Sequence, residues 1–181
     1  MFHLHKTRMT IAEYFALPEI LQPIELIGGE VIVRPMPTPK HQLVVGDFLF
    51  LLDRLIPDGE VFPSPLDVYL DDEHVLQPEI LWVAANSRCK IGELRLEGPP
   101  DLVVEVFSPG WALHDIKTKF DLYQRFAVRE YWMVNAEEQY VEVHRHENGV
   151  FVRQGVYSPD EAFVSAALGG KMVALKGIFG N

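Results

Sequence analysis

Apolar and polar residues alternate along this chain with the periods of both helices and strands. Helical spacing predicts helices from Thr10 to before Pro18, over 41–56 and over 113–126. Strand-like runs are found over 24–27, 30–33, 61–70, 77–84, 101–107, 131–134, 140–144 and 151–157. This order predicts a single α/β or α+β domain over residues 1–181, with an N-terminal hairpin and a β-rich C-terminal tail.

Capping and turn residues support the N-terminal part of this assignment. Thr10 and Glu13 have the T-x-x-E spacing of a capping box, which is typical of a helix start. Gly28-Gly29 separates two strand-like runs and predicts a tight hairpin turn. The proline-rich residues 35–39 predict a loop.

Glu105 stands in the middle of a strand that is otherwise suited to burial. Alternation puts Leu102, Val104 and Val106 on one face and Glu105 on the other. A buried carboxylate is costly unless it is paired, hydrogen-bonded or bound to a metal. Glu105 is therefore a candidate site residue, and an ion pair at the strand end is the structural alternative.

Asp101 precedes Glu105 by four residues on the same strand. That separation is roughly 13 Å at about 3.3 Å per residue. Ligand oxygens lie about 2.1 Å from a Mg²⁺ ion. Asp101 is therefore excluded as a direct co-ligand of Glu105 and stays an accessory acid.

The two strands that flank the polar residues 71–75 are expected to form a hairpin. A register that sets Leu70 opposite Leu76 also sets Asp67 opposite Glu79. Like charges across a ladder need a compensating cation or proton, so both carboxylates are candidate metal ligands beside the strand of Glu105. A slip of one residue would separate them. Glu79 is otherwise a surface residue at a strand start.

Lys119 falls inside the apolar stripe of the predicted helix 113–126, whereas Lys117 lies on its polar side. The stripe consists of Ile116, Phe120, Tyr123, Phe126 and Ala127. A lysine aimed at the protein interior needs an acidic partner. It either pairs locally with Asp115 or reaches the carboxylate cluster, where it would position or polarise a water molecule.

Other polar residues are weaker candidates. His41 is expected either to contact a phosphate or a carboxylate, or to be a surface histidine at the start of a helix. Glu25 and Glu30 are accessory acids, although solvated glutamates on a hairpin are the favoured interpretation. His144 and His146 fit simple alternation in an exposed strand.

Composition limits the class of protein. The chain of 181 residues is 48% hydrophobic and 23% charged, as is usual for a globular domain. Its single cysteine, Cys89, excludes an internal disulfide. No apolar run is long enough for a membrane span or a secretory signal, so we expect a cytoplasmic protein.

The net charge of −10 weighs against tight binding of nucleic acid. Proteins that bind phosphate backbones usually carry a basic surface. Any such surface must be local here, or bound metal ions or a partner must supply the positive charge.

The candidate residues belong to a set of motifs that together resemble the Uma2 family, formerly DUF820. The resemblance covers nearly the whole chain. Its motifs are Ile24-Glu25-Leu26-Ile27-Gly28-Gly29-Glu30, His41, Gln77-Pro78-Glu79-Ile80, Gly98 to Pro109, Asp115-x-x-x-Lys119-x-x-x-Tyr123 and Glu130-Tyr131-Trp132-Met133-Val134.

The resemblance implies a restriction-endonuclease-like core, a central mixed sheet flanked by helices, with a PD-(D/E)XK site. Pro78-Glu79 would take the place of PD, where the family usually has aspartate. Glu105-Val106-Phe107 would take the place of (D/E)XK. The motif's lysine is replaced by Phe107, and Lys119 on the following helix matches the lysine that takes over this role in the family.

The implied activity is endonucleolytic hydrolysis of DNA with Mg²⁺ or Mn²⁺. Glu79 and Glu105, together with Asp67, would hold the metal, and Lys119 would assist the attacking water. A homodimer is expected by analogy, because cutting both strands of a duplex calls for two sites. The alternative is a non-enzymatic binding or scaffold protein that keeps the fold.

Overall fold

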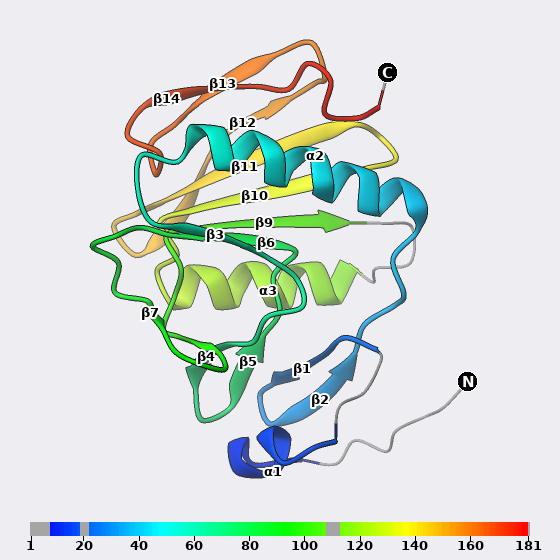
Figure 1. Ribbon diagram of the computed structural model, residues 1–181, viewed down its shortest axis with the longest axis vertical. Helices are drawn as coiled ribbons and strands as arrows, with labels where there is room; N and C mark the ends of the chain where they lie inside the picture. Colours follow the sequence, from blue (N-terminus) through cyan, green and yellow to red (C-terminus); the bar gives the residue numbers. More distant parts are fainter. Residues whose placement is uncertain (1–7, 19–21, 108–112, 181) are drawn as a thin grey trace.

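The computed structural model describes residues 8–18, 22–107 and 113–180 (Figure 1). Its helices are α1 (Ile11–Phe15), α2 (Pro39–Leu55) and α3 (Leu113–Arg125). The strands form two six-stranded sheets and a separate two-stranded hairpin.

The central sheet has the strand order β12-β11-β10-β9-β6-β3. Its strands are β3 (Glu60–Pro63), β6 (Ile80–Val83), β9 (Leu102–Phe107), β10 (Glu130–Asn135), β11 (Tyr140–Glu147) and β12 (Val150–Tyr157). The β9–β10 pair is parallel and the other pairs are antiparallel. The expected mixed central sheet is confirmed.

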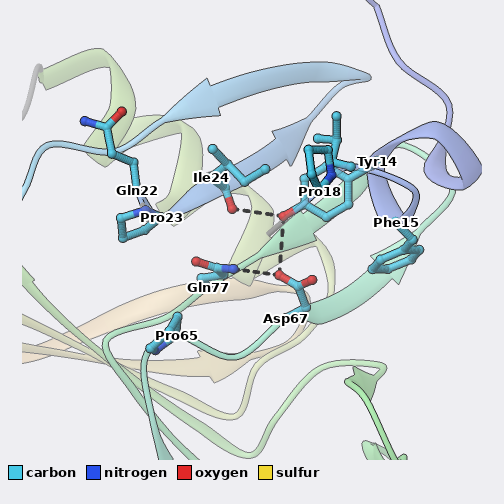
Figure 2. A pocket seen from close by; sticks show the side chains of 10 residues that line it. Tyr14, Phe15, Pro18, Gln22, Pro23, Ile24, Pro65, Asp67 and Gln77 are labelled. Atoms are coloured by element: carbon cyan, nitrogen blue, oxygen red, sulfur yellow. Dashed lines mark hydrogen bonds between the residues drawn. The ribbon is translucent and has the colours of Figure 1, made fainter. Parts of the chain in front are cut away.

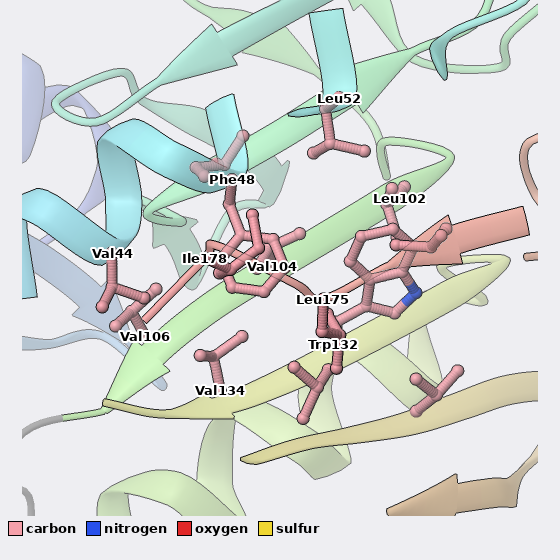
Figure 3. Packing of buried hydrophobic residues seen from close by; sticks show 14 of the residues in the cluster. Val44, Phe48, Leu52, Leu102, Val104, Val106, Trp132, Val134, Leu175 and Ile178 are labelled. Atoms are coloured by element: carbon pink, nitrogen blue, oxygen red, sulfur yellow. The ribbon is translucent and has the colours of Figure 1, made fainter. Parts of the chain in front are cut away.

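Helices α2 and α3 cover opposite faces of the central sheet. Val44, Phe48 and Leu52 of α2 pack in one cluster with Leu102, Val104, Val106 and Trp132 (Figure 3). Leu122 and Tyr123 of α3 pack instead with Val103 and Tyr131. Alternation along β9 therefore directs Glu105 toward α3, and burial on both faces explains why the strand is almost wholly apolar.

The second sheet, of order β2-β1-β5-β4-β8-β7, lies below the central sheet in Figure 1. Its strands are β1 (Ile24–Ile27), β2 (Glu30–Val33), β4 (Val68–Asp71), β5 (His74–Leu76), β7 (Lys90–Ile91) and β8 (Leu96–Glu97). The predicted N-terminal hairpin is present: Ile27 pairs with Glu30 across Gly28 and Gly29, which both have positive φ.

The predicted long strand 61–70 is wrong. The chain divides it between β3 and β4, which belong to different sheets, and Pro63 and Pro65 lie at the division. Proline supplies no N–H to a ladder, so a continuous central strand is disfavoured there. The predicted pairing with 77–84 is present only in divided form: β3 pairs antiparallel with β6 in the central sheet, and β4 pairs antiparallel with β5 in the second sheet. Both registers differ from the predicted one.

The helix starts follow their caps. Thr10 and Glu13 form both hydrogen bonds of the predicted capping box. Helix α2 begins at Pro39, two residues before the predicted start, because Thr38 caps it and proline suits the first turn. His41 thereby falls in the first turn of α2.

The β-rich tail ends in the hairpin of β13 (Ala162–Ser165) and β14 (Lys171–Ala174). Phe163, Val173 and Leu175 join the cluster on the α2 face of the central sheet. In the described part of the chain, no helix has the length and apolar character needed to cross a membrane.

Candidate active site

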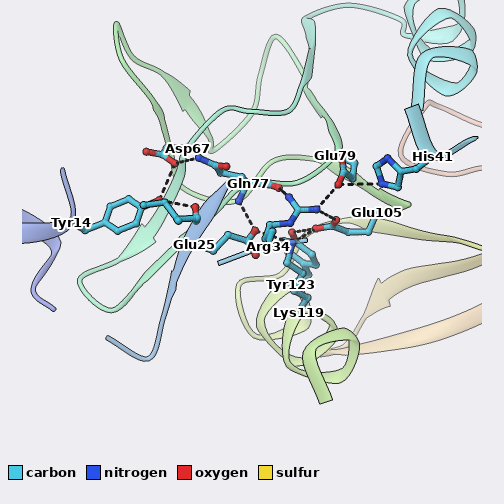
Figure 4. Close-up of polar contacts among 11 residues, drawn as sticks. Tyr14, Glu25, Arg34, His41, Asp67, Gln77, Glu79, Glu105, Lys119 and Tyr123 are labelled. Carbon is cyan, nitrogen blue, oxygen red and sulfur yellow. Dashed lines mark hydrogen bonds and ion pairs between the residues drawn. The ribbon is translucent and has the colours of Figure 1, made fainter. Parts of the chain in front are cut away.

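Seven polar side chains from both sheets and two helices gather where the second sheet meets the central sheet (Figure 4). They are Glu25 of β1, Arg34 after β2, His41 of α2, Glu79 before β6, Glu105 of β9, and Lys119 and Tyr123 of α3. All seven are at most 7% exposed. A charged cluster with this little exposure is stable only if its members compensate one another.

Glu105 is fully buried and is held by α3. Its Oε1 accepts hydrogen bonds from Lys119 Nζ at 2.8 Å and from Tyr123 Oη at 2.6 Å. Lys119 and Tyr123 lie four residues apart, on one face of the helix, so both reach the same oxygen. The Glu105 Oε2 atom is buried and accepts no hydrogen bond from the residues that the structure describes.

Lys119 links two carboxylates from different sheets. Its ammonium lies 2.8 Å from Glu25 Oε1 and 2.8 Å from Glu105 Oε1. The backbone N–H of Gln77 also donates to Glu25 Oε1, at 2.7 Å. Helical phase correctly selected Lys119 over Lys117, which is exposed and pairs with Asp121.

Arg34 places a second cation beside the carboxylates. Its Nη2 pairs closely with Glu79 Oε1 and lies 3.9 Å from Glu105 Oε2. Its Nη1 donates to the Gln77 carbonyl, and its own backbone N–H donates to the Pro23 carbonyl at 2.9 Å. The guanidinium is thus fixed between the two sheets.

Glu79 is held by His41 as well as by Arg34. His41 Nε2 lies 2.9 Å from the Val106 carbonyl and 3.4 Å from Glu79 Oε1. Because a carbonyl only accepts, Nε2 carries the proton. Burial opposes ionisation of Glu79, but His41 and the positive charges of Arg34 and Lys119 outweigh it and lower the pKa of Glu79.

Tyr123 acts in this cluster as a hydrogen-bond donor. Burial raises the pKa of its phenol well above the ordinary value, and the neighbouring charges of Glu105 and Glu25 raise it further. The phenol is therefore protonated at neutral pH and fixes the Glu105 carboxylate from one side.

The donor chemistry of Glu79 and Glu105 suits a hard divalent cation. Mg²⁺ is commonly bound by one or two carboxylates together with water and phosphate oxygens. Within the described part of the chain, Glu105 Oε2 is a buried oxygen with no hydrogen bond, which suits a metal ligand. Among residues 8–18, 22–107 and 113–180, however, no group of three or more His, Cys, Asp or Glu side chains is arranged to hold a metal.

Asp67 does not lie opposite Glu79, so this prediction was wrong. Val68 pairs with Leu76, a register shifted by two residues from the predicted one. Asp67 instead accepts hydrogen bonds from Tyr14 Oη at 3.3 Å and Gln77 Nε2 at 2.8 Å. These contacts lie beside a pocket lined in part by Phe15, Pro18, Pro23 and Pro65 (Figure 2).

Of the accessory candidates, Glu25 and His41 lie in the cluster and Asp101 does not. Asp101, just before β9, accepts hydrogen bonds from Ala84 N at 2.9 Å and Arg129 Nη1 at 3.1 Å. Neither partner is one of the seven clustered side chains. Glu25 was expected to be solvated, but it is 1% exposed. His41 is also buried and contacts a carboxylate, as one of its two interpretations predicted.

Alternation had suggested that His144 lies in an exposed strand, but the structure buries this side chain. It is 6% exposed, its Nε2 lies 2.9 Å from Glu142, and it packs among Phe120, Tyr131 and Phe151. Burial lowers the pKa of His144 in spite of the neighbouring Glu142. The contacts indicate a structural role.

Arg34 and Tyr123 were missed as site residues. Tyr123 was assigned to the apolar stripe, where its ring does pack, and its spacing from Lys119 was the available signal for a shared partner. Arg34 gave only a weak signal, a lone cation at the end of a strand before Pro35.

Comparisons with known proteins bear on the family and the fold of the chain. A family model described as "Uma2: Putative restriction endonuclease" matches residues 11–173. No curated protein matches the chain. A crystal structure of "a putative nuclease belonging to DUF820" from Anabaena variabilis ATCC 29413 is similar, with a TM-score of 0.78 and 22% sequence identity. The similarity covers 94% of this chain and 97% of that chain, and it confirms the expected fold.

Proposed function

Because the chain belongs to the Uma2 family, we propose that it is a nuclease that hydrolyses phosphodiester bonds in DNA with Mg²⁺ or Mn²⁺. One observation carries the proposal: Glu79, Glu105 and Lys119 meet in a single buried cluster although they come from three different elements. The position of Glu105 in β9 and of Glu79 before β6 fits the order of a PD-(D/E)XK site.

Glu79 and Glu105 are the proposed metal ligands. A divalent cation bound there would stabilise negative charge on the phosphate and lower the pKa of a bound water. His41 and Tyr123 would keep the two carboxylates in place, since each donates to one of them or to the adjoining backbone. Asp67 is left out because its contacts are with Tyr14 and Gln77.

Lys119 is proposed to take the role of the motif's lysine in place of Phe107. In hydrolysis the water loses a proton as its oxygen bonds to phosphorus, the bond to the leaving oxygen breaks and that oxygen takes up a proton, while negative charge grows on the phosphate oxygens. A fixed ammonium beside Glu105 would stabilise that charge or orient the water. Glu25 would hold the ammonium from the opposite side.

A nicking assay tests this function. Supercoiled plasmid would be incubated with Mg²⁺ or Mn²⁺ and either the wild type, Glu105→Gln or Glu137→Gln, a control in an exposed pair with Lys40. We expect the wild type and the control to nick the plasmid and Glu105→Gln to lose about 100-fold or more in rate. Absence of nicking by the wild type, or equal nicking by Glu105→Gln, would refute the proposal.

The rival function is a non-enzymatic binding or scaffold role. It is favoured by Arg34, which pairs with both proposed metal ligands. The same assay separates the two, because a scaffold would not nick DNA with any metal. The homodimer and the cytoplasmic location stay predictions.

A further inference from the structure

Arg34 places its guanidinium beside both of the carboxylates that are proposed as metal ligands. Its guanidinium pairs closely with Glu79 and lies 3.9 Å from Glu105 Oε2. In Figure 4 dashed lines join it to both side chains. The arginine is 4% exposed, so little solvent screens its charge from either carboxylate.

The charges of the cluster are nearly balanced without any metal. The carboxylates of Glu25, Glu79 and Glu105 meet the cations of Arg34 and Lys119. A divalent cation would enter next to an arginine whose charge repels it. The strength of that repulsion depends on distance and on the low effective dielectric of a buried site.

The local contacts make Arg34 a built-in member of the site. Its second nitrogen donates to the Gln77 carbonyl, and its backbone is bonded to Pro23. The first contact holds the guanidinium and the second holds the backbone of Arg34, and neither involves a carboxylate. At 3.9 Å the guanidinium donates no hydrogen bond to Glu105 Oε2, so it acts on this oxygen through its charge.

We propose that Arg34 is an internal counter-cation that competes with a divalent metal for Glu79 and Glu105 and thereby sets the metal affinity of the site. Arg34 is a positioning residue in this scheme, because it acts through the two carboxylates. The inference rests on the proposed metal site, and it adds a control of metal occupancy by a residue of the chain itself.

Mn²⁺ binding measures this competition directly, without reference to activity. Metal-free protein would be titrated with Mn²⁺ and free Mn²⁺ followed by its paramagnetic resonance signal. We expect Arg34→Met to bind Mn²⁺ about tenfold or more tightly than the wild type, since a repelling charge is removed. Arg34→Lys, which keeps the charge on a single nitrogen, should bind Mn²⁺ with an affinity between those of the wild type and Arg34→Met.

Two controls make the result specific. Arg129→Met removes an arginine from another carboxylate, Asp101, and should leave Mn²⁺ affinity unchanged. Adding Glu105→Gln to Arg34→Met should abolish the gain, because one proposed ligand is lost. Arg34→Gln, which keeps hydrogen-bond donors near Gln77, serves in the same way if Arg34→Met does not fold.

The outcomes separate this inference from the proposed function. Equal Mn²⁺ affinity of the wild type and the folded Arg34 variants, or no binding by any of them, would overturn the competition. Plasmid nicking by the wild type in that case would leave the nuclease function standing. Tighter binding by the variants without nicking by any protein would support the competition and overturn the nuclease.

Discussion

Lys119 is the residue on which the buried cluster depends most. Its ammonium is 1% exposed and lies 2.8 Å from both Glu25 and Glu105. Removing one partner of a buried ion pair is costly because the other charge stays buried without compensation. Here a single substitution would take the ammonium from two carboxylates, leaving Glu25 with the Gln77 N–H and Glu105 with Tyr123 and the more distant Arg34.

We therefore expect Lys119→Met to lower the free energy of unfolding by about 3–5 kcal/mol. Lys117→Met, the same change two residues earlier on α3, should have almost no effect, because Lys117 is exposed. Urea denaturation of both variants measures the difference. An equal loss of unfolding free energy in the two variants would show that Lys119 is not part of a desolvated network.

Asp67 offers a test of pH dependence outside the cluster. Burial raises the pKa of its carboxyl, and hydrogen bonds from Gln77 and Tyr14 oppose this only in part. The folded state therefore favours the protonated acid. The stability that this provides is present at pH values below the unfolded pKa, about 3.9, and is lost as the pH rises through the folded value.

Asp67→Asn removes this ionisation and keeps an acceptor for Tyr14. We expect the melting temperature of the variant to rise relative to the wild type as the pH is raised from about 4 to 7. Asp53→Asn, at an exposed position of α2, is the matched control. A constant difference between Asp67→Asn and the wild type across this range would contradict the assignment.

At the scale of elements, Glu130 connects β10 to the C-terminal tail. Its Oε1 accepts from Trp132 Nε1 at 2.7 Å, and its Oε2 accepts from the N–H groups of Ala166 and Ala167 at 2.9 and 3.0 Å. Glu130 is 1% exposed, so these donors would lose their partner in a dry environment.

Glu130→Ala is expected to cost about 3 kcal/mol of stability and to loosen the β13–β14 hairpin. Amide hydrogen exchange should quicken first at Ala166 and Ala167. Glu137→Ala, which removes an exposed glutamate, should leave both quantities close to those of the wild type. Unchanged exchange at the two alanines in Glu130→Ala would refute this anchoring role.

The elements also explain which parts of the site the sequence could predict. Glu105 and Lys119 were found because each is a charged residue at a buried position of a regular element, and periodicity is a local property. Asp67 was misplaced because strand pairing is not local: Pro63 and Pro65 lie where the chain passes from one sheet to the other.

Arg34 could not have been predicted by the same means. Its partners lie just before β6 and in β9, while its own position is fixed at the end of the N-terminal hairpin. Only the packing of the second sheet against the central one brings them together. Periodicity within β2 carries no information about that contact.

At the scale of the whole molecule, the net charge of −10 bears on the proposed substrate. An acidic protein gains little from phosphate neutralisation. We therefore expect metal-free protein to bind a labelled DNA duplex weakly in about 150 mM salt. Ca²⁺, a hard cation that takes the same type of oxygen ligand, should strengthen binding.

Fluorescence anisotropy with EDTA or Ca²⁺ measures this effect, and Glu79→Gln provides the comparison in which a proposed ligand is removed. The increase in DNA affinity caused by Ca²⁺ should be smaller in Glu79→Gln than in the wild type. Tight binding in EDTA with a steep dependence on salt would indicate a basic surface instead, and it would contradict a metal-dependent contact.

The division of the site between two sheets also has a consequence during synthesis. The hairpin that carries Glu25 and Arg34 leaves the ribosome well before α3, which carries Lys119 and Tyr123. Until α3 emerges, the cluster lacks the ammonium that joins Glu25 to Glu105. A growing chain therefore has no assembled site, and any hydrolytic activity must await residues as far as α3.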